Sequence, residues 1–102
     1  MKVTETRLNG VLIIEPKVFG DGRGFFKETF QAERYRQIGI DLPFVQDNFS
    51  RSQKGVLRGL HFQKTKPQGK LVSCVRGAVW DVAVDIDPRS PTYGTHVGIE
   101  LS

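Results

Sequence analysis

The sequence predicts an all-β domain, and three observations support that prediction. Seven short stretches have the β-rich composition or the period-2 alternation typical of β-strands, at residues 11–15, 24–30, 44–50, 56–63, 70–76, 78–86 and 95–101. Turn signals rich in Gly, Pro, Asp and Ser separate most of these stretches. Only residues 31–38 are suited to a helix. Many short strands with one brief helix are typical of a β-sandwich or barrel.

The composition is that of an ordinary globular protein. The 102 residues are 38% hydrophobic and 25% charged, so we expect a single domain over residues 1–102. The net charge is +4 and the basic residues are scattered, which favours a small anionic ligand or no charged ligand at all over nucleic acid. The one cysteine, Cys74, excludes a disulfide framework. Because there is neither a signal peptide nor an apolar run of ~20 residues, we expect a cytoplasmic protein without a membrane partner.

The first third of the chain predicts two strands. Residues 11–15 (VLIIE) are rich in β-formers and stop before Pro16. Residues 20–24 (GDGRG) predict a flexible turn, and the strand at 24–30 then places Phe26 and Glu28 on one face. The glycines resemble a phosphate-binding loop, but the P-loop pattern and its following helix are missing.

The predicted helix at residues 31–38 (QAERYRQI) has Tyr35 as a packing residue and ends at Gly39. In the next predicted strand, Gln46 and Asn48 fall on the same face. Such a polar face either meets solvent or lines a polar ligand cavity.

The later strands are separated by clear breaks. Residues 53–55 (QKG) predict a turn, a loop follows at 64–68, Gly77 turns the chain again, and 88–91 (PRSP) form a loop. The last predicted strand ends next to Ser102, with no further strand to close an eight-stranded barrel. We therefore expect either a truncated chain or a sheet completed by another subunit.

Residues 56–63 (VLRGLHFQ) contain the strongest chemical candidate, His61, one of two histidines. A neutral imidazole in a polar cleft can act as a general base near neutral pH. If it removes the α-proton of a ketone, the enolate oxygen needs a positive charge, which Lys70 or Arg58 could supply. The alternatives are a structural hydrogen-bonded histidine, a solvated lysine and an edge ion pair of the arginine.

The spacing of Gly55 and His61 fits the beginning of the cupin metal motif GxxxxxHxH. Gln63 stands where the second histidine belongs, and Lys66 and Lys70 add positive charge. A divalent cation prefers several imidazoles and carboxylates. We therefore expect a barrel with no metal and no other cofactor.

Three long stretches resemble one family: KVFGDGRGFFKETF, FVQDNFSRSQKGVLRGLHFQ and QGKLVSCVRGAVWDVAVDIDPRSPTYG. They are similar, in order and spacing, to the dTDP-4-dehydrorhamnose 3,5-epimerases, cupin-fold enzymes of dTDP-L-rhamnose biosynthesis. The resemblance implies a cupin-like antiparallel jelly roll with one short helix, incomplete at its C-terminus. It also implies a metal-free isomerase that works as a homodimer on a nucleotide sugar, dTDP-4-dehydro-6-deoxy-D-glucose.

The resemblance assigns roles to individual residues. His61 matches the proton acceptor for C3 and C5, and Lys70 matches the lysine beside the 4-keto oxygen. The implied substrate-binding residues are Arg23, Glu28, Gln46, Asp47, Asn48 and Arg58, and Phe26 matches an apolar wall. The alternatives are a single-site 3- or 5-epimerase, a 3,4-ketoisomerase on the same fold, or a non-catalytic binding fragment.

The resemblance leaves two features of the site to explain: the proton donor and the orientation of Arg58 relative to His61. In the family, the proton-donating tyrosine lies beyond the stretch matched here, and neither Tyr35 nor Tyr93 matches it. In addition, an ideal strand would place Arg58 and His61 on opposite faces, so we predict that Gly59 marks a bulge or twist that redirects one of them. Further along the chain, Asp81 is a candidate partner for the His61 ring and, equally, for Arg58 or Arg76.

Overall fold

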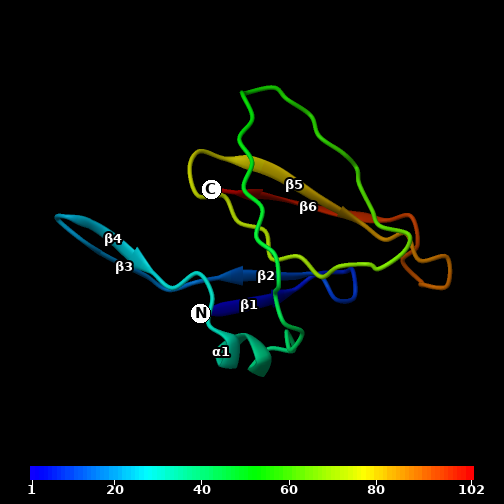
Figure 1. Cartoon of the computed structure of the whole chain (residues 1–102), viewed down its shortest axis with the longest axis horizontal. Helices are drawn as coiled ribbons and strands as arrows, with labels where there is room; N and C mark the ends of the chain where they lie inside the picture. The colour runs from blue at the N-terminus through cyan, green and yellow to red at the C-terminus, as the bar shows by residue number, and fades with distance from the viewer.

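The computed structural model describes residues 1–102 and contains six strands and one helix. In chain order these are β1 (Lys2–Glu5), β2 (Leu12–Glu15), β3 (Val18–Asp21), β4 (Gly24–Lys27), α1 (Ala32–Gln37), β5 (Val79–Val84) and β6 (His96–Leu101). Each pair of consecutive strands forms its own two-stranded antiparallel sheet, β1–β2, β3–β4 and β5–β6 (Figure 1). The predicted mixture of strands with one short helix is confirmed, with six strands rather than seven.

The β1–β2 hairpin has one strand that the sequence did not predict. β1 (KVTE) is short and mostly polar, and it gains its partner through the register Val3↔Ile14 and Glu5↔Leu12. Between the strands, the Thr6 hydroxyl donates to the Val11 carbonyl over 2.8 Å. Leu8, in this loop, is one of only two buried residues, at 3% exposure.

The β3–β4 hairpin is an arm that projects from the rest of the chain (Figure 1). Its register pairs Gly20 with Phe25 and Asp21 with Gly24. The turn predicted at 20–24 is confirmed but shorter, with only Gly22 and Arg23 in the loop, because the unpredicted strand β3 includes Gly20 and Asp21. The strand predicted at 24–30 also ends early, at Lys27. A two-residue loop with Gly24 at φ +138° is typical of tight hairpins, in which glycine tolerates the backbone angle.

Helix α1 matches its prediction within a residue at each end. The Gln31 side chain caps it by accepting a hydrogen bond from the Arg34 amide at 2.7 Å. Tyr35 is buried at 3% exposure, its hydroxyl donates to the Thr29 carbonyl at 3.0 Å, and its ring meets Phe30 edge-on at 4.9 Å. Gly39 ends the helix at φ +93°. With six residues, α1 is far too short to cross a membrane, and the structure has no other helix.

The β5–β6 hairpin is the longest ladder, and it confirms the last two predicted strands. Six residue pairs run from Val79↔Leu101 to Val84↔His96. On one face Trp80 lies over Gly98: a Cβ on Gly98 would come within 2.6 Å of the indole ring. The opposite face carries Val97, Ile99 and Leu101, all half-buried.

Residues 41–78 form no strand, so the strands predicted at 44–50, 56–63 and 70–76 are wrong for this structure. The segment runs as a long open path between α1 and β5 (Figure 1). Its one backbone hydrogen bond, from the Val56 amide to the Gln53 carbonyl at 3.3 Å, confirms the predicted turn at 53–55. Alternation alone does not make a strand, because a strand also needs a neighbour with which to exchange hydrogen bonds.

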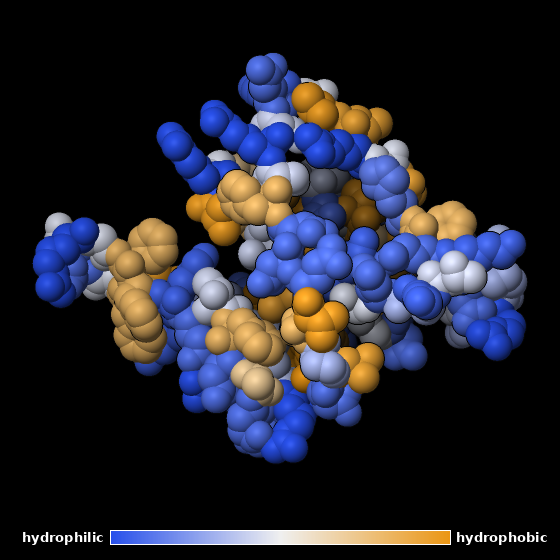
Figure 2. Space-filling model, in the orientation of Figure 1, coloured by the Kyte–Doolittle hydropathy of each residue, from blue (hydrophilic) through white to orange (hydrophobic).

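The hydrophobic core is correspondingly small. Besides Leu8 and Tyr35 no residue is buried, and large apolar side chains such as Val45 and Leu57 are 88% and 91% exposed. Figure 2 shows hydrophobic side chains on the arm and elsewhere over the visible face. A domain of this length normally buries well over half of its surface. Most of the large apolar side chains therefore lie at the surface of these 102 residues.

Candidate active site

The candidate site residues lie in two separate regions. Arg23 is in the loop of the β3–β4 arm, and Glu28 follows β4. The six others all lie in segment 41–78: Gln46, Asp47, Asn48, Arg58, His61 and Lys70. No hydrogen bond or ion pair joins one region to the other.

Arg23 is held at the tip of the arm by Asp21. The Arg23 amide donates to one carboxylate oxygen at 2.8 Å, and Nη2 donates to the other at 2.7 Å. The side-chain hydrogen bond from Arg23, followed by its backbone hydrogen bond, lowers the pKa of Asp21. The Arg23 side chain is 92% exposed and its guanidinium has five N–H donors, so part of it stays available for an anion.

Glu28 faces an arginine that the sequence analysis did not single out. Arg34 of α1 donates from Nε to Oε1 at 2.8 Å and from Nη2 to Oε2 at 2.5 Å. These hydrogen bonds lower the pKa of Glu28, with the charge of Arg34 as a smaller cause. A spacing of six residues across the end of a strand gives no sequence signal for such a pair. The pair ties the base of the arm to the helix.

Gln46 and Asn48 point the same way, as their spacing predicted. The Gln46 Nε2 donates to the Asn48 Oδ1 at 3.1 Å, although no strand is formed there. Asp47, between them, is exposed and makes no hydrogen bond or ion pair through its side chain. The two amides keep free donors and acceptors, which suits binding of a polyhydroxylated ligand.

The backbone bends at Gly59, beside His61. Gly59 has φ +99°, and a Cβ there would lie 3.3 Å from His61 Nδ1 and 3.4 Å from its backbone nitrogen. The imidazole is therefore folded back over the glycine. No regular ladder passes through residues 57–62, so the bend replaces the predicted bulge. Arg58 turns elsewhere, and its Nη2 donates to the Arg51 carbonyl at 3.3 Å.

The two proposed catalytic side chains are exposed and unpaired. Neither His61 nor Lys70 takes part in a side-chain hydrogen bond or an ion pair. Asp81, a candidate partner of His61, Arg58 or Arg76, is half-buried in β5 and pairs with none of them. No three His, Cys, Asp or Glu side chains lie close enough together to hold a metal ion.

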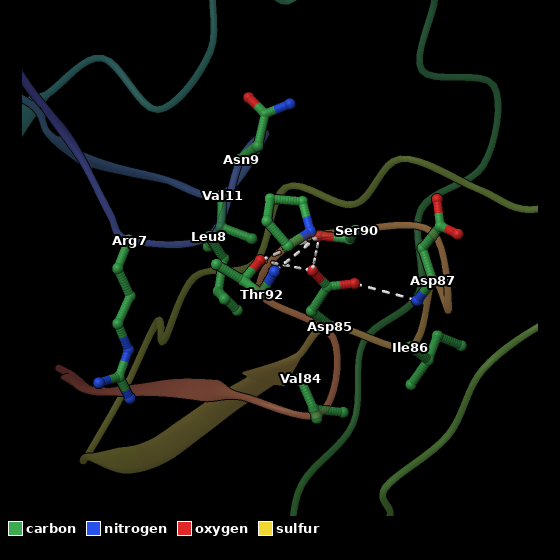
Figure 3. A pocket seen from close by; sticks show the side chains of 11 residues that line it. Arg7, Leu8, Asn9, Val11, Val84, Asp85, Ile86, Asp87, Ser90 and Thr92 are labelled. Atoms are coloured by element: carbon green, nitrogen blue, oxygen red, sulfur yellow. Dashed lines mark hydrogen bonds between the residues drawn. The ribbon is translucent and has the colours of Figure 1, made fainter.

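A pocket of about 650 Å³ lies away from all of these residues, between the β1–β2 loop and the loop after β5 (Figure 3). The hydrogen bonds among its polar lining residues converge on the Asp85 carboxylate. This carboxylate accepts from the Ser90 hydroxyl, from the Thr92 hydroxyl at 2.6 Å and from the Asp87 amide at 3.0 Å. These bonds, the one from Ser90 first, lower the pKa of Asp85. The carboxylate organises its own loop, a role that the sequence analysis missed.

Comparison with known proteins shows to which family this chain belongs. The model of the family described as dTDP-4-dehydrorhamnose 3,5-epimerase matches residues 5–102. The chain belongs to this family. A relative with the same description from Escherichia coli is 56% identical over 104 residues, which cover 100% of this chain and 56% of the relative. A relative from Streptomyces niveus, described as dTDP-4-dehydrorhamnose 3-epimerase, is 43% identical over 99% of this chain and 50% of its own length.

A solved structure matches this fold over nearly the whole chain. The dTDP-6-deoxy-D-glucose-3,5-epimerase of Legionella pneumophila, in complex with dTDP-4-keto-L-rhamnose, superposes with a TM-score of 0.92 at 57% identity. The superposition covers 99% of this chain and 54% of the Legionella chain. The cupin-like, mainly β fold class is thereby confirmed. The chain spans about half the length of the curated relatives that it matches.

Proposed function

We propose that these residues form the base-bearing part of a dTDP-4-dehydrorhamnose 3,5-epimerase site within one cupin-like domain. The substrate is dTDP-4-dehydro-6-deoxy-D-glucose, inverted at C3 and C5 to dTDP-4-dehydro-L-rhamnose. The observation that carries this proposal is the family match over residues 5–102, which includes His61 on an accessible stretch of chain. The protein would work in the cytoplasm as a homodimer, without a metal or other cofactor.

His61 is the proposed base. The C3 and C5 protons both flank the C4 ketone, so removing either gives an enolate whose negative charge rests on the C4 oxygen. The exposed His61 imidazole has no competing partner, which leaves it free to accept each proton. The Lys70 ammonium is the proposed counter-charge for the enolate oxygen.

Inversion also needs an acid that returns the proton to the opposite face. Tyr35 does not suit this role, because it is buried, its hydroxyl donates to the Thr29 carbonyl, and burial raises its pKa. Tyr93 is exposed on the loop before β6, beyond the pocket of Asp85. The proposed role of the described residues is therefore binding and proton abstraction.

Binding is proposed to involve both candidate regions. The guanidinium groups of Arg23 and Arg58 suit the pyrophosphate, since planar N–H forks match its oxygens. Gln46, Asp47 and Asn48 suit sugar or base hydroxyl and amide groups, and Glu28 is the proposed binding residue at the base of the arm, where it is paired with Arg34.

Single-site epimerisation is the second candidate. The Streptomyces niveus relative, a 3-epimerase by description, is 43% identical to this chain. Both candidates share the base and the ketone, and they differ in whether the proton at C5 is also removed.

Proton NMR of dTDP-4-dehydro-6-deoxy-D-glucose in heavy water tests the proposal. We expect the C3 and C5 signals to disappear with the native chain. Exchange should fall by about 10²–10⁴ in His61→Ala, the usual contribution of a general base. His96→Ala, which removes the other histidine, is the matched control and should exchange normally. Loss of the C3 signal alone would favour the 3-epimerase. Binding without any exchange would overturn the catalytic proposal and leave a binding function.

A further inference from the structure

The Glu28–Arg34 pair joins two elements that are each fixed by contacts of their own. Glu28 follows β4 at the base of the arm, and Arg34 belongs to α1. The backbone amide of Arg34 is held by the Gln31 cap at 2.7 Å. The next residue, Tyr35, is buried, and its hydroxyl donates to the carbonyl of Thr29, which follows Glu28. The two charged side chains therefore meet across a junction that is already ordered, so holding them together costs little extra conformational entropy.

The pair is a two-pronged contact between an arginine and a carboxylate. Nε and Nη2 of Arg34 donate to different oxygens of Glu28, at 2.8 Å and 2.5 Å. A carboxylate has about four acceptor positions, so about half of them remain for N–H or O–H groups of a ligand. The Glu28 side chain is 41% exposed, which leaves these positions within reach of a ligand.

A carboxylate in a site for a diphosphate needs a counter-charge. An unpaired Glu28 would repel the negatively charged pyrophosphate that the proposed function places in the same site. The positive charge of Arg34 offsets this repulsion, while the carboxylate remains a hydrogen-bond acceptor. Arg36, in the same helix, does not supply this charge, because it pairs with Glu33 within α1.

We propose that Arg34 is a positioning residue of the binding site, which orients the Glu28 carboxylate and neutralises its charge so that the site accepts a diphosphate. This inference rests on the proposed function, in which Glu28 and Arg23 bind one nucleotide sugar. It adds a residue that acts through Glu28 and does not touch the ligand. Glu28 selects ligand groups that donate hydrogen bonds, and Arg34 makes that selection compatible with an anionic ligand.

NMR titration of the chain with dTDP and with thymidine, which lacks the diphosphate, tests the proposal. Arg34→Gln should weaken dTDP binding by about fivefold, the size of a favourable surface charge pair, and thymidine binding by much less. Glutamine is a good helix former and the Gln31 cap uses only the backbone at position 34, so the amide signals of α1 should persist. Arg36→Gln is the matched control and should bind both ligands normally.

Two further variants separate positioning from direct contact with the ligand. Arg34→Lys keeps the charge without the planar fork, so it should recover most of the preference for dTDP over thymidine. In Glu28→Gln/Arg34→Gln the pair is again uncharged, so the same preference should return to within about twofold of its native value.

Equal dTDP affinity of Arg34→Gln and Arg36→Gln would overturn the proposal, as would an equal loss of affinity for dTDP and thymidine. A double variant whose preference for dTDP stays as low as that of Arg34→Gln would show that Arg34 contacts the diphosphate itself, which also contradicts the proposal. A native chain that binds neither ligand would instead contradict the proposed function on which this inference rests, so the two failures are distinct.

Discussion

The β5–β6 hairpin and segment 41–78 have the same kind of sequence and opposite structures. Both alternate apolar and polar residues. β5 and β6 exchange hydrogen bonds over six residue pairs, and the ladder continues with the Asp85 amide donating to the Thr95 carbonyl at 2.9 Å. Segment 41–78 has a single backbone bond at a turn. Alternation shows that a stretch can be a strand, whereas an available neighbour decides whether it is one.

The largest expected effect contrasts a packed residue with an exposed one. Tyr35→Ala removes one of two buried side chains, its ring contact with Phe30 and its hydrogen bond to Thr29, and should lower the free energy of unfolding by about 3 kcal/mol. Leu57→Ala, at a residue 91% exposed, should change it by less than about 0.5 kcal/mol. Urea unfolding followed by circular dichroism measures both. Equal effects would show that the two regions are packed alike.

Gly59→Ala sharpens the description of the His61 surroundings. Alanine at φ +99° costs about 1–2 kcal/mol of backbone strain, and its Cβ would crowd His61 Nδ1. Gly55→Ala is the control: its φ of +86° brings similar strain, but its Cβ meets nothing within 4 Å. The imidazole NMR signals of His61 should therefore shift in the first variant and stay in place in the second. Identical spectra would mean that His61 does not lie against Gly59.

Gly98→Ala tests the contact between Trp80 and Gly98 on one face of β5–β6. The new Cβ would come within 2.6 Å of the Trp80 indole, which must rotate away at a cost of about 1 kcal/mol. Trp80 fluorescence should shift to the red as the ring becomes more exposed. Gly69→Ala, where a Cβ meets nothing within 4 Å, should leave both fluorescence and stability unchanged. An unchanged emission spectrum in Gly98→Ala would argue against the indole lying over this glycine.

The smallest effect concerns the Glu28–Arg34 pair. Because the pKa of Glu28 is lowered from 4.5 in the folded state, the stabilisation is present above pH 4.5 and is lost as pH falls through the lower folded value. Arg34→Gln should move the Glu28 pKa back toward 4.5, as measured by NMR titration of its side-chain carboxyl carbon. Arg36→Gln, which removes the partner of Glu33 instead, should leave Glu28 as it was. A Glu28 pKa that does not respond to Arg34→Gln would show that the pair does not form in solution.

The sequence predicted those parts of the fold that depend on nearby residues. The turn at 53–55, helix α1 with its stop at Gly39, and strands β2, β5 and β6 follow from local signals or from partners nearby along the chain. Strand β1 was missed because its polar residues carry no alternation, and its partner β2 defines it. The strands expected in segment 41–78 failed for the opposite reason, since their pattern is present and their neighbours are not.

In the candidate site, too, features set by local spacing could be predicted and features set by loop geometry could not. The shared direction of Gln46 and Asn48 follows from period-2 spacing and is confirmed by their hydrogen bond. The bend at Gly59 follows from the incompatible faces of Arg58 and His61. The Glu28–Arg34 pair and the Asp85 cluster depend on loop geometry that spacing does not encode. The roles of His61 and Lys70 come from the family resemblance and remain predictions.

Amide hydrogen exchange of the 102-residue chain alone tests the central contrast most directly. We predict slowed exchange at the ladder amides of β1–β2, β3–β4 and β5–β6 and in α1, with segment 41–78 exchanging near its unprotected rate apart from Val56. Protection at alternate residues of 44–50, 56–63 or 70–76 would contradict the account, because it would mean that these stretches already have strand partners within the chain.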